Sequence, residues 1–133
     1  MEAQLKQVFF DTIKRFAAYE NLKVHYPNKN FKTIGLDRYL KLAVLPVDPK
    51  ILTLRGGSEY MWLLQVSIYM VDNDGTIPSD RIIGSLRNLF PVTTKLTGGE
   101  YEFQIIGPAN VAPLIEMVGW SFIPVQFPVN IIS

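Results

Sequence analysis

The sequence predicts an α+β fold: a mainly antiparallel or mixed β-sheet with two helices packed on one face and a protruding β-arm, in the order α-β-β-β-α-β-β-β. Three observations lead to this class. Residues 2–20 and 78–90 repeat apolar side chains at helical spacing, residues 58–71 alternate over an unusual length, and shorter alternating segments are separated by glycine and proline. No repeat or linker divides the chain, so we expect one domain spanning residues 1–133.

The first predicted helix covers residues 2–20. Side chains at intervals of three and four form its predicted buried face: Leu5, Val8, Phe9, Thr12, Ile13, Phe16 and Ala17. An acid near the start (Glu2) and bases toward the end suit the helix dipole, and Asn21 is a suitable stop. A helix that packs on the core is favoured here over one that binds a partner.

Two strands are predicted next. Residues 22–26 are typical of a short edge strand that ends at Pro27, and residues 27–37 are typical of a loop. Residues 38–46 alternate, with Leu40, Leu42 and Val44 on one face, and predict a second, longer strand.

Residues 50–57 have the composition of a strand but lie between a proline pair and a glycine pair, and we interpret them as the arm. Surface loops are normally polar, so apolar side chains at a loop tip indicate an interface. The interface candidates are Ile51, Leu52, Leu54 and Arg55. The alternative is a third short strand that folds over the sheet.

Residues 58–71 form the longest predicted strand, around which the other elements are arranged. One face is wholly apolar: Tyr60, Trp62, Leu64, Val66, Ile68 and Met70. The other face is mixed: Glu59, Met61, Leu63, Gln65, Ser67 and Tyr69. This length predicts a central strand with neighbours on both sides. The mixed face is either half-solvated or covered by another subunit.

The second helix is predicted to open at Pro78 and to end at Pro91. Residues 92–97 and 101–107 then flank a Gly98-Gly99 hairpin turn. Residues 108–118 are interpreted as an irregular crossing, with a turn of helix at 112–117.

Residues 119–129 are predicted to close the domain as a strand. Pro124 and Pro128 cannot donate ladder hydrogen bonds, so we expect this strand to lie at an edge or to leave the sheet there.

Composition excludes several classes of protein. With 48% hydrophobic and 19% charged residues, the chain is globular and poor in charge, which favours an oligomer. A net charge of +1 produces no strong field toward nucleic acid or membrane. There is no cysteine, no apolar run of about 20 residues and no signal-peptide pattern, so a soluble protein made in the cytoplasm is expected.

No catalytic or metal-binding pattern is present in the sequence. His25 is the only histidine, and a metal site or a catalytic triad would depend on it alone. The turn at residues 72–75 resembles part of a calcium loop, but the first ligand position falls on Met70 and the closing acid position on Arg81. The two glycine pairs lack the lysine of a phosphate loop. We therefore expect no enzyme, no cofactor and no metal.

An ordered set of segments carries a family resemblance. It comprises LAVLPVDP (42–49), ILTL (51–54) before a glycine pair, LQVSI (64–68), LFP (89–91), KL (95–96), residues 108–113, GW (119–120) and IPV (123–125). Together they resemble a family of phage and prophage proteins that is similar in fold to the tail terminator of long, flexible-tailed phages, the lambda minor tail protein U type. The resemblance covers roughly residues 36–129.

The resemblance implies a virion protein that forms a hexameric ring on the end of the tail tube, stops tube polymerisation and offers a docking surface for the head completion protein. The tail tube protein and the head completion or connector protein are its implied partners. DNA would pass through the lumen without specific binding, and no membrane is involved. Assembly would take place in the host bacterial cytoplasm.

Two alternatives stay open from the residues alone. One is a small α+β ligand- or protein-binding module with an apolar pocket between helices and sheet. The other is an enzyme in which Glu59, Glu100 and Glu102 would have to converge.

Overall fold

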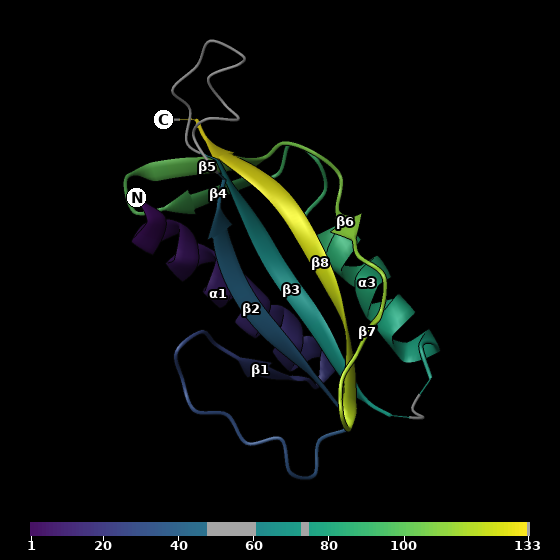
Figure 1. Cartoon of the computed structure of the whole chain (residues 1–133). Helices are drawn as coiled ribbons and strands as arrows, with labels where there is room; N and C mark the ends of the chain where they lie inside the picture. Colours follow the sequence, from purple (N-terminus) through teal and green to yellow (C-terminus); the bar gives the residue numbers. More distant parts are fainter. Residues whose placement is uncertain (48–60, 73–74, 133) are drawn as a thin grey trace.

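The computed structural model describes residues 1–47, 61–72 and 75–132. These ranges hold two helices and eight strands around one sheet, an α+β fold as predicted (Figure 1). In chain order they are α1 (Glu2–Glu20), β1 (Lys23–His25), β2 (Arg38–Pro46), β3 (Met61–Val71), α3 (Ile77–Leu89), β4 (Lys95–Gly98), β5 (Tyr101–Ile105), β6 (Asn110–Val111), β7 (Ile115–Glu116) and β8 (Trp120–Ile131). The predicted arm lies outside the described residues.

The sheet has the order β1-β2-β3-β8-β5-β4, and β6 and β7 pair with β8 beyond the end of β5. β1 runs parallel to β2 at the edge, and every other pair is antiparallel. β3 lies between β2 and β8 and pairs along its length with both. This confirms the prediction of a long central strand, which the sequence extended to residue 58, beyond the described part.

α1 buries one face and ends at a residue that suits a helix stop. Its buried side chains recur every three or four residues and include Leu5, Phe9, Ile13 and Phe16. Asn21 adopts the left-handed conformation (φ 57°, ψ 45°), in which its N–H caps carbonyls of the last turn. An asparagine accepts this conformation more readily than most residues, so the predicted stop is confirmed.

α3 packs on the same face of the sheet as α1, and both helices lie behind the strands in Figure 1. Pro78 occupies the first turn, where its missing N–H costs nothing, and Pro91 follows the end. Phe90 joins the layers: its ring lies 6.2 Å from that of Phe9 on α1 and 5.0 Å from that of Phe127 on β8.

One apolar core fills the space between the helices and the sheet. The wholly apolar face of β3 points into it, with Trp62, Leu64, Val66, Ile68 and Met70 all buried. In-register side chains from both neighbours continue this layer, for example Leu42 and Val125 on either side of Val66. The period of two therefore predicted the buried face of β3 correctly.

β8 is not an edge strand, and that prediction is wrong. β3 covers one side of it, while β7, β6 and β5 follow one another along the other side. Ala112 donates to the carbonyl of Pro124 and Ile106 to that of Pro128, both from this second side. The N–H and C=O groups of one strand residue point to the same side of the strand. The side on which each proline lacks an N–H is therefore the side of β7, β6 and β5, where the pairing with β8 is interrupted.

The crossing at residues 108–118 also differs from the prediction. The expected turn of helix at 112–117 is absent from these described residues, which include β7 and lie beside β8. β8 offers ladder groups that short segments can pair with, and tertiary pairing overrides the weak local helix signal. The Gly98-Gly99 hairpin is confirmed with a shift of one residue, since Gly98 pairs with Tyr101 and the turn is formed by Gly99 (φ 59°) and Glu100.

Candidate functional site

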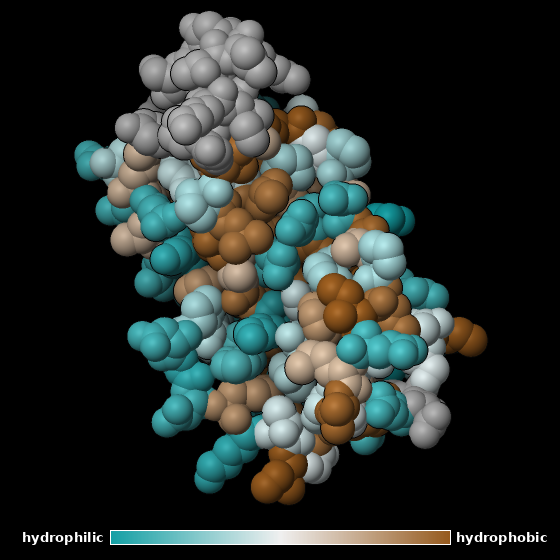
Figure 2. Space-filling view, in the orientation of Figure 1, coloured by the Kyte–Doolittle hydropathy of each residue, from teal (hydrophilic) through white to brown (hydrophobic). Residues whose placement is uncertain are grey.

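The sheet has a second face that neither α1 nor α3 covers, which we call the helix-free face (Figure 2). It is formed by the outward side chains of β2, β3 and β8: Tyr39, Lys41, Ala43, Leu45, Met61, Leu63, Gln65, Ser67, Tyr69, Val71, Trp120, Phe122, Pro124, Gln126, Pro128 and Asn130. Lys41 is the one charged residue among them. Apolar and neutral polar groups therefore dominate this surface, as the mixed face of β3 predicted.

A row of rings crosses the helix-free face. The ring centroids lie 4.9 Å apart for His25 and Phe31, 4.8 Å for Phe31 and Tyr39, 4.8 Å for Tyr39 and Tyr69, and 4.7 Å for Tyr69 and Phe122. The last two pairs are within 13° of parallel, because these residues are direct partners in the ladder. Their faces stack on one another, and the side chains of Tyr39 and Tyr69 are buried within the row.

Burial changes the acidity of this row. It raises the pKa of Tyr69, and it raises the pKa of Tyr39, with a further contribution from the neighbouring Tyr69. Both phenols therefore stay protonated beyond their usual range and keep a hydrogen-bond donor.

An amide ladder lies beside the aromatic row. Gln126 Nε2 donates to Gln65 Oε1 at 2.8 Å, and Gln65 Nε2 donates to Ser67 Oγ at 3.3 Å. These hydrogen bonds pair polar groups of Gln65, Gln126 and Ser67 with one another. A partner that covers this surface would then leave fewer polar groups without a hydrogen bond. Beyond them, Leu45, Leu63 and Pro128 form an apolar patch in register.

Residues 114–119 form a second exposed apolar feature, which we call the apolar turn. Leu114, Met117 and Val118 are 40%, 51% and 102% exposed. Met117 donates to the carbonyl of Trp120 at 2.7 Å, and Gly119 has φ 81°, a conformation that suits glycine. Sequence reasoning missed this feature, although the glycine between two alternating segments was the signal for a hairpin turn.

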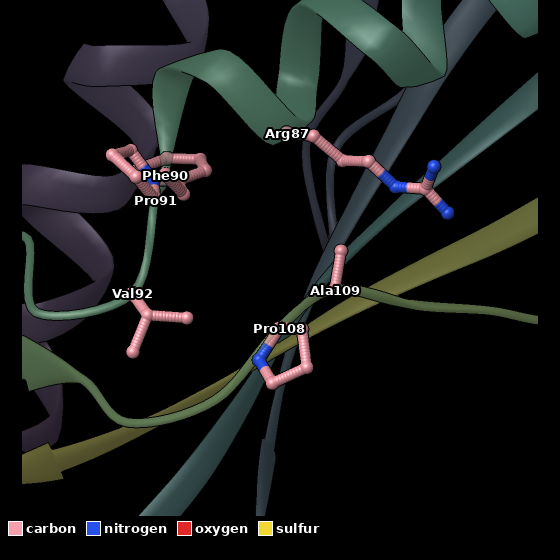
Figure 3. Close-up of a pocket in the computed structure, with 6 residues that line it drawn as sticks. All are labelled: Arg87, Phe90, Pro91, Val92, Pro108 and Ala109. Atoms are coloured by element: carbon pink, nitrogen blue, oxygen red, sulfur yellow. The ribbon is translucent and has the colours of Figure 1, made fainter.

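A hollow of about 260 Å³ lies where α3 ends (Figure 3). Its lining is apolar except for one base: Arg87, Phe90, Pro91, Val92, Pro108 and Ala109. Figure 3 shows Val92 on one side and Pro108 with Ala109 on the other, with the guanidinium of Arg87 directed away from Val92. Thr93 donates to the carbonyl of Ile105 at 2.8 Å, so the two sides are tied together by backbone.

The remaining sequence candidates have structural roles or lie outside the described residues. His25 stacks on Phe31, and its Nε2 lies 3.1 Å from the carbonyl of Lys29. Ile51, Leu52, Leu54 and Arg55 lie outside the described residues, as does Glu59. Within residues 1–47, 61–72 and 75–132, no group of three His, Cys, Asp or Glu side chains could hold a metal. No helix of the described residues is long and apolar enough to cross a membrane.

Comparisons with known proteins place the chain in a family. The model of the phage tail terminator protein family matches residues 2–128. No curated protein sequence matches. A solved chain that carries no functional name is 18% identical, with a TM-score of 0.80, over 100% of this chain and 96% of that one. A chain from the virion of a native gene transfer agent particle is 13% identical, with a TM-score of 0.65, over 96% and 93%.

At these identities the two structural likenesses concern the fold alone. The family match extends over nearly the whole sequence and carries the assignment. The chain therefore belongs to the phage tail terminator protein family and has a structural role in a phage tail.

Proposed function

We propose that residues 1–133 act as one domain that closes into a ring, most simply a hexamer, on the end of the tail tube. In this position the ring stops tube polymerisation and presents a surface to the head completion or connector protein. The role is structural and needs no catalysis or cofactor. Assembly takes place in the host cytoplasm, and the protein stays in the virion.

The observation that carries this proposal is the helix-free face. The described residues of β2, β3 and β8 give this face one charge, a stacked aromatic row and an apolar patch, and a surface of this kind is normally covered in the working state of a protein. A subunit in a ring on a tube end has a neighbour on each side and a partner above and below, so such a face can be covered. The low overall charge agrees with this.

The lumen of the ring has to let DNA pass without holding it. The net charge of +1 supports this, because tight non-specific binding needs many phosphate contacts from a basic surface. The aromatic row supports it as well. Its middle rings stack on one another and leave no free face for a base.

The arm adds a second contact in this proposal. Ile51, Leu52, Leu54 and Arg55 remain interface candidates from the sequence. We expect that Leu52→Ser with Leu54→Ser, or Arg55→Glu, reduces ring formation and tail joining. Intact rings and joined tails with both variants would remove the arm from the proposal.

The direct test adds purified protein to polymerising tail tube protein and images the tube ends by negative-stain electron microscopy. Wild-type protein is expected to cap the ends and to halt elongation. Leu45→Glu places a charge on an exposed position of the helix-free face and should abolish capping. Tyr19→Glu, at an exposed position of α1, is the matched control and should cap normally. Uncapped tubes that keep growing in the presence of wild-type protein contradict the proposed function.

A further inference from the structure

We propose that the apolar turn of one copy inserts Met117 and Val118 into the hollow at the end of α3 of the next copy, with Glu116 facing Arg87 across the contact. This inference rests on the proposed ring, because it names the surfaces through which neighbouring subunits meet.

Two backbone hydrogen bonds hold the turn in place. The Met117–Trp120 hydrogen bond closes it, and the N–H of Asp72 at the end of β3 donates to the carbonyl of Gly119 at 3.3 Å. Val118 at its tip is fully exposed. Single exposed apolar residues are ordinary, but here Leu114, Ile115, Met117 and Val118 are exposed together on a segment held from two sides. A preorganised apolar projection loses little conformational entropy on insertion.

The hollow fits a side chain better than a ligand. Its volume of about 260 Å³ is below the range of about 300–1,000 Å³ usual for small-molecule sites. An apolar cavity of about 150 Å³ already holds a benzene-sized group. One or two apolar side chains therefore fill this space, and its walls (Phe90, Val92, Ala109) offer them apolar contact.

Charge complementarity selects a second copy as the occupant. Glu116 immediately precedes the inserted residues, and Arg87 is the one charged residue of the hollow. Neither has an ion-pair partner among the residues that the structure describes. An acid beside the projection and a base beside the hollow pair when two copies meet.

A copy cannot fill its own hollow. Pro108 and Ala109 precede β6, which pairs with β8 near Gln126, whereas the apolar turn lies where β8 begins. At about 3.3 Å per strand residue, the six residue steps from Trp120 to Gln126 separate the two features by roughly 20 Å along β8. Two different patches that fit each other make a head-to-tail contact, which closes into a ring when the rotation allows.

Charge exchange tests the contact on the full chain. Glu116→Arg and Arg87→Glu should each weaken self-association by about tenfold, measured by light scattering across a concentration series. The double variant should regain wild-type association. An equimolar mixture of the two single variants should regain it too, because each projection then finds a hollow of opposite charge. If neither combination restores association, the proposal is overturned.

A second pair of variants addresses the apolar part. Val118→Asp should weaken association at least a hundredfold, because the carboxylate would lose its hydration among apolar walls while Arg87 is paired with Glu116 in the proposed contact. Ile34→Asp, at an equally exposed position in the β1–β2 loop, should leave it unchanged. The chain has no cysteine, so Val118→Cys with Val92→Cys should give a ladder of disulfide-linked oligomers under mild oxidation. Val118→Cys with Tyr19→Cys should give no ladder, because Tyr19 does not line the hollow, and an identical ladder from both would contradict the contact.

The outcomes separate this inference from the proposed function. If Val118→Asp forms rings that cap tubes like wild type, the subunits meet elsewhere and the terminator function stands. If it forms normal rings that no longer bind tubes, the turn contacts the tube protein and the inference is overturned. If wild-type protein neither self-associates nor caps tubes, both proposals fail.

Discussion

The two faces of the central sheet consist of the same strands and differ in what covers them. On one face, alternate residues of β2, β3 and β8 are buried under α1 and α3. On the other, the intervening residues form an aromatic row, an amide ladder and an apolar patch that no described helix covers. A period of two thus places the core on one face and leaves the other face, in the proposed ring, for contact with other subunits. The comparison predicts that substitutions on the two faces differ in both size and readout.

The largest expected difference lies within β8. Phe127 is fully buried on the helix side and contacts Phe90, so Phe127→Ala should lower the free energy of unfolding by about 3–5 kcal/mol. Phe122, partly exposed on the helix-free face, is its matched control, and Phe122→Ala should cost only about 1–2 kcal/mol. Urea unfolding of both variants measures this. Equal losses would show that the helix-free face is part of the stabilising core.

The features of the sheet that sequence could predict are those that depend on local period. Every second side chain of residues 61–71 is apolar and buried, from Trp62 to Met70, and Asn21 and Pro91 mark helix ends through their own backbone preferences. These properties belong to each segment alone, so they survive whatever the segment packs against.

The position of β8 could not be predicted in the same way. Proline argues against a central strand only if its missing donor faces a paired neighbour, and that depends on where residues 105–116 pass. The hollow could not be predicted for the same reason. Arg87 and Ala109 are far apart in sequence and meet only because β6 pairs with β8. The exposed turn depends on the same crossing, because it is the pairing of β7 with β8 that fixes where the turn lies.

The second largest effect concerns two glycines with different surroundings. A Cβ at Gly98 would lie 2.6 Å from the carbonyl oxygen of Gln4, so α1 can approach β4 this closely only because position 98 has no side chain. Gly98→Ala should therefore destabilise the protein by about 1–3 kcal/mol. A Cβ at Gly84 on α3 would meet nothing within 4 Å, and Gly84→Ala should stabilise by about 0.5–1 kcal/mol. Thermal unfolding that shifts both variants in the same direction would contradict this contrast.

The amide ladder should contribute less. Gln126→Met keeps the length of the side chain and removes the bond to Gln65, so the free energy of unfolding should fall by about 0.5–1 kcal/mol. Gln7→Met on exposed α1, where Gln7 bonds Asp11, should change it by less than about 0.5 kcal/mol. If the ladder also positions the face for assembly, Gln126→Met should weaken tube capping while Gln7→Met does not. Normal capping by both variants would show that the ladder contributes to stability and not to assembly.

The smallest expected effect is a loss of unfolding free energy that begins only at alkaline pH. The pKa values of Tyr39 and Tyr69 are raised above the usual 10.0 by burial, so the folded state holds these protons more tightly than the unfolded state. The stability that they contribute is fully present below about pH 10 and is lost as the pH rises through their raised pKa values. The Tyr39→Phe, Tyr69→Phe double variant should show a flatter decline in unfolding free energy above pH 10. If the double variant and wild type lose unfolding free energy equally above pH 10, the burial of these two hydroxyl groups does not affect stability. The helix-free face would then be more solvated than its stacked rings indicate.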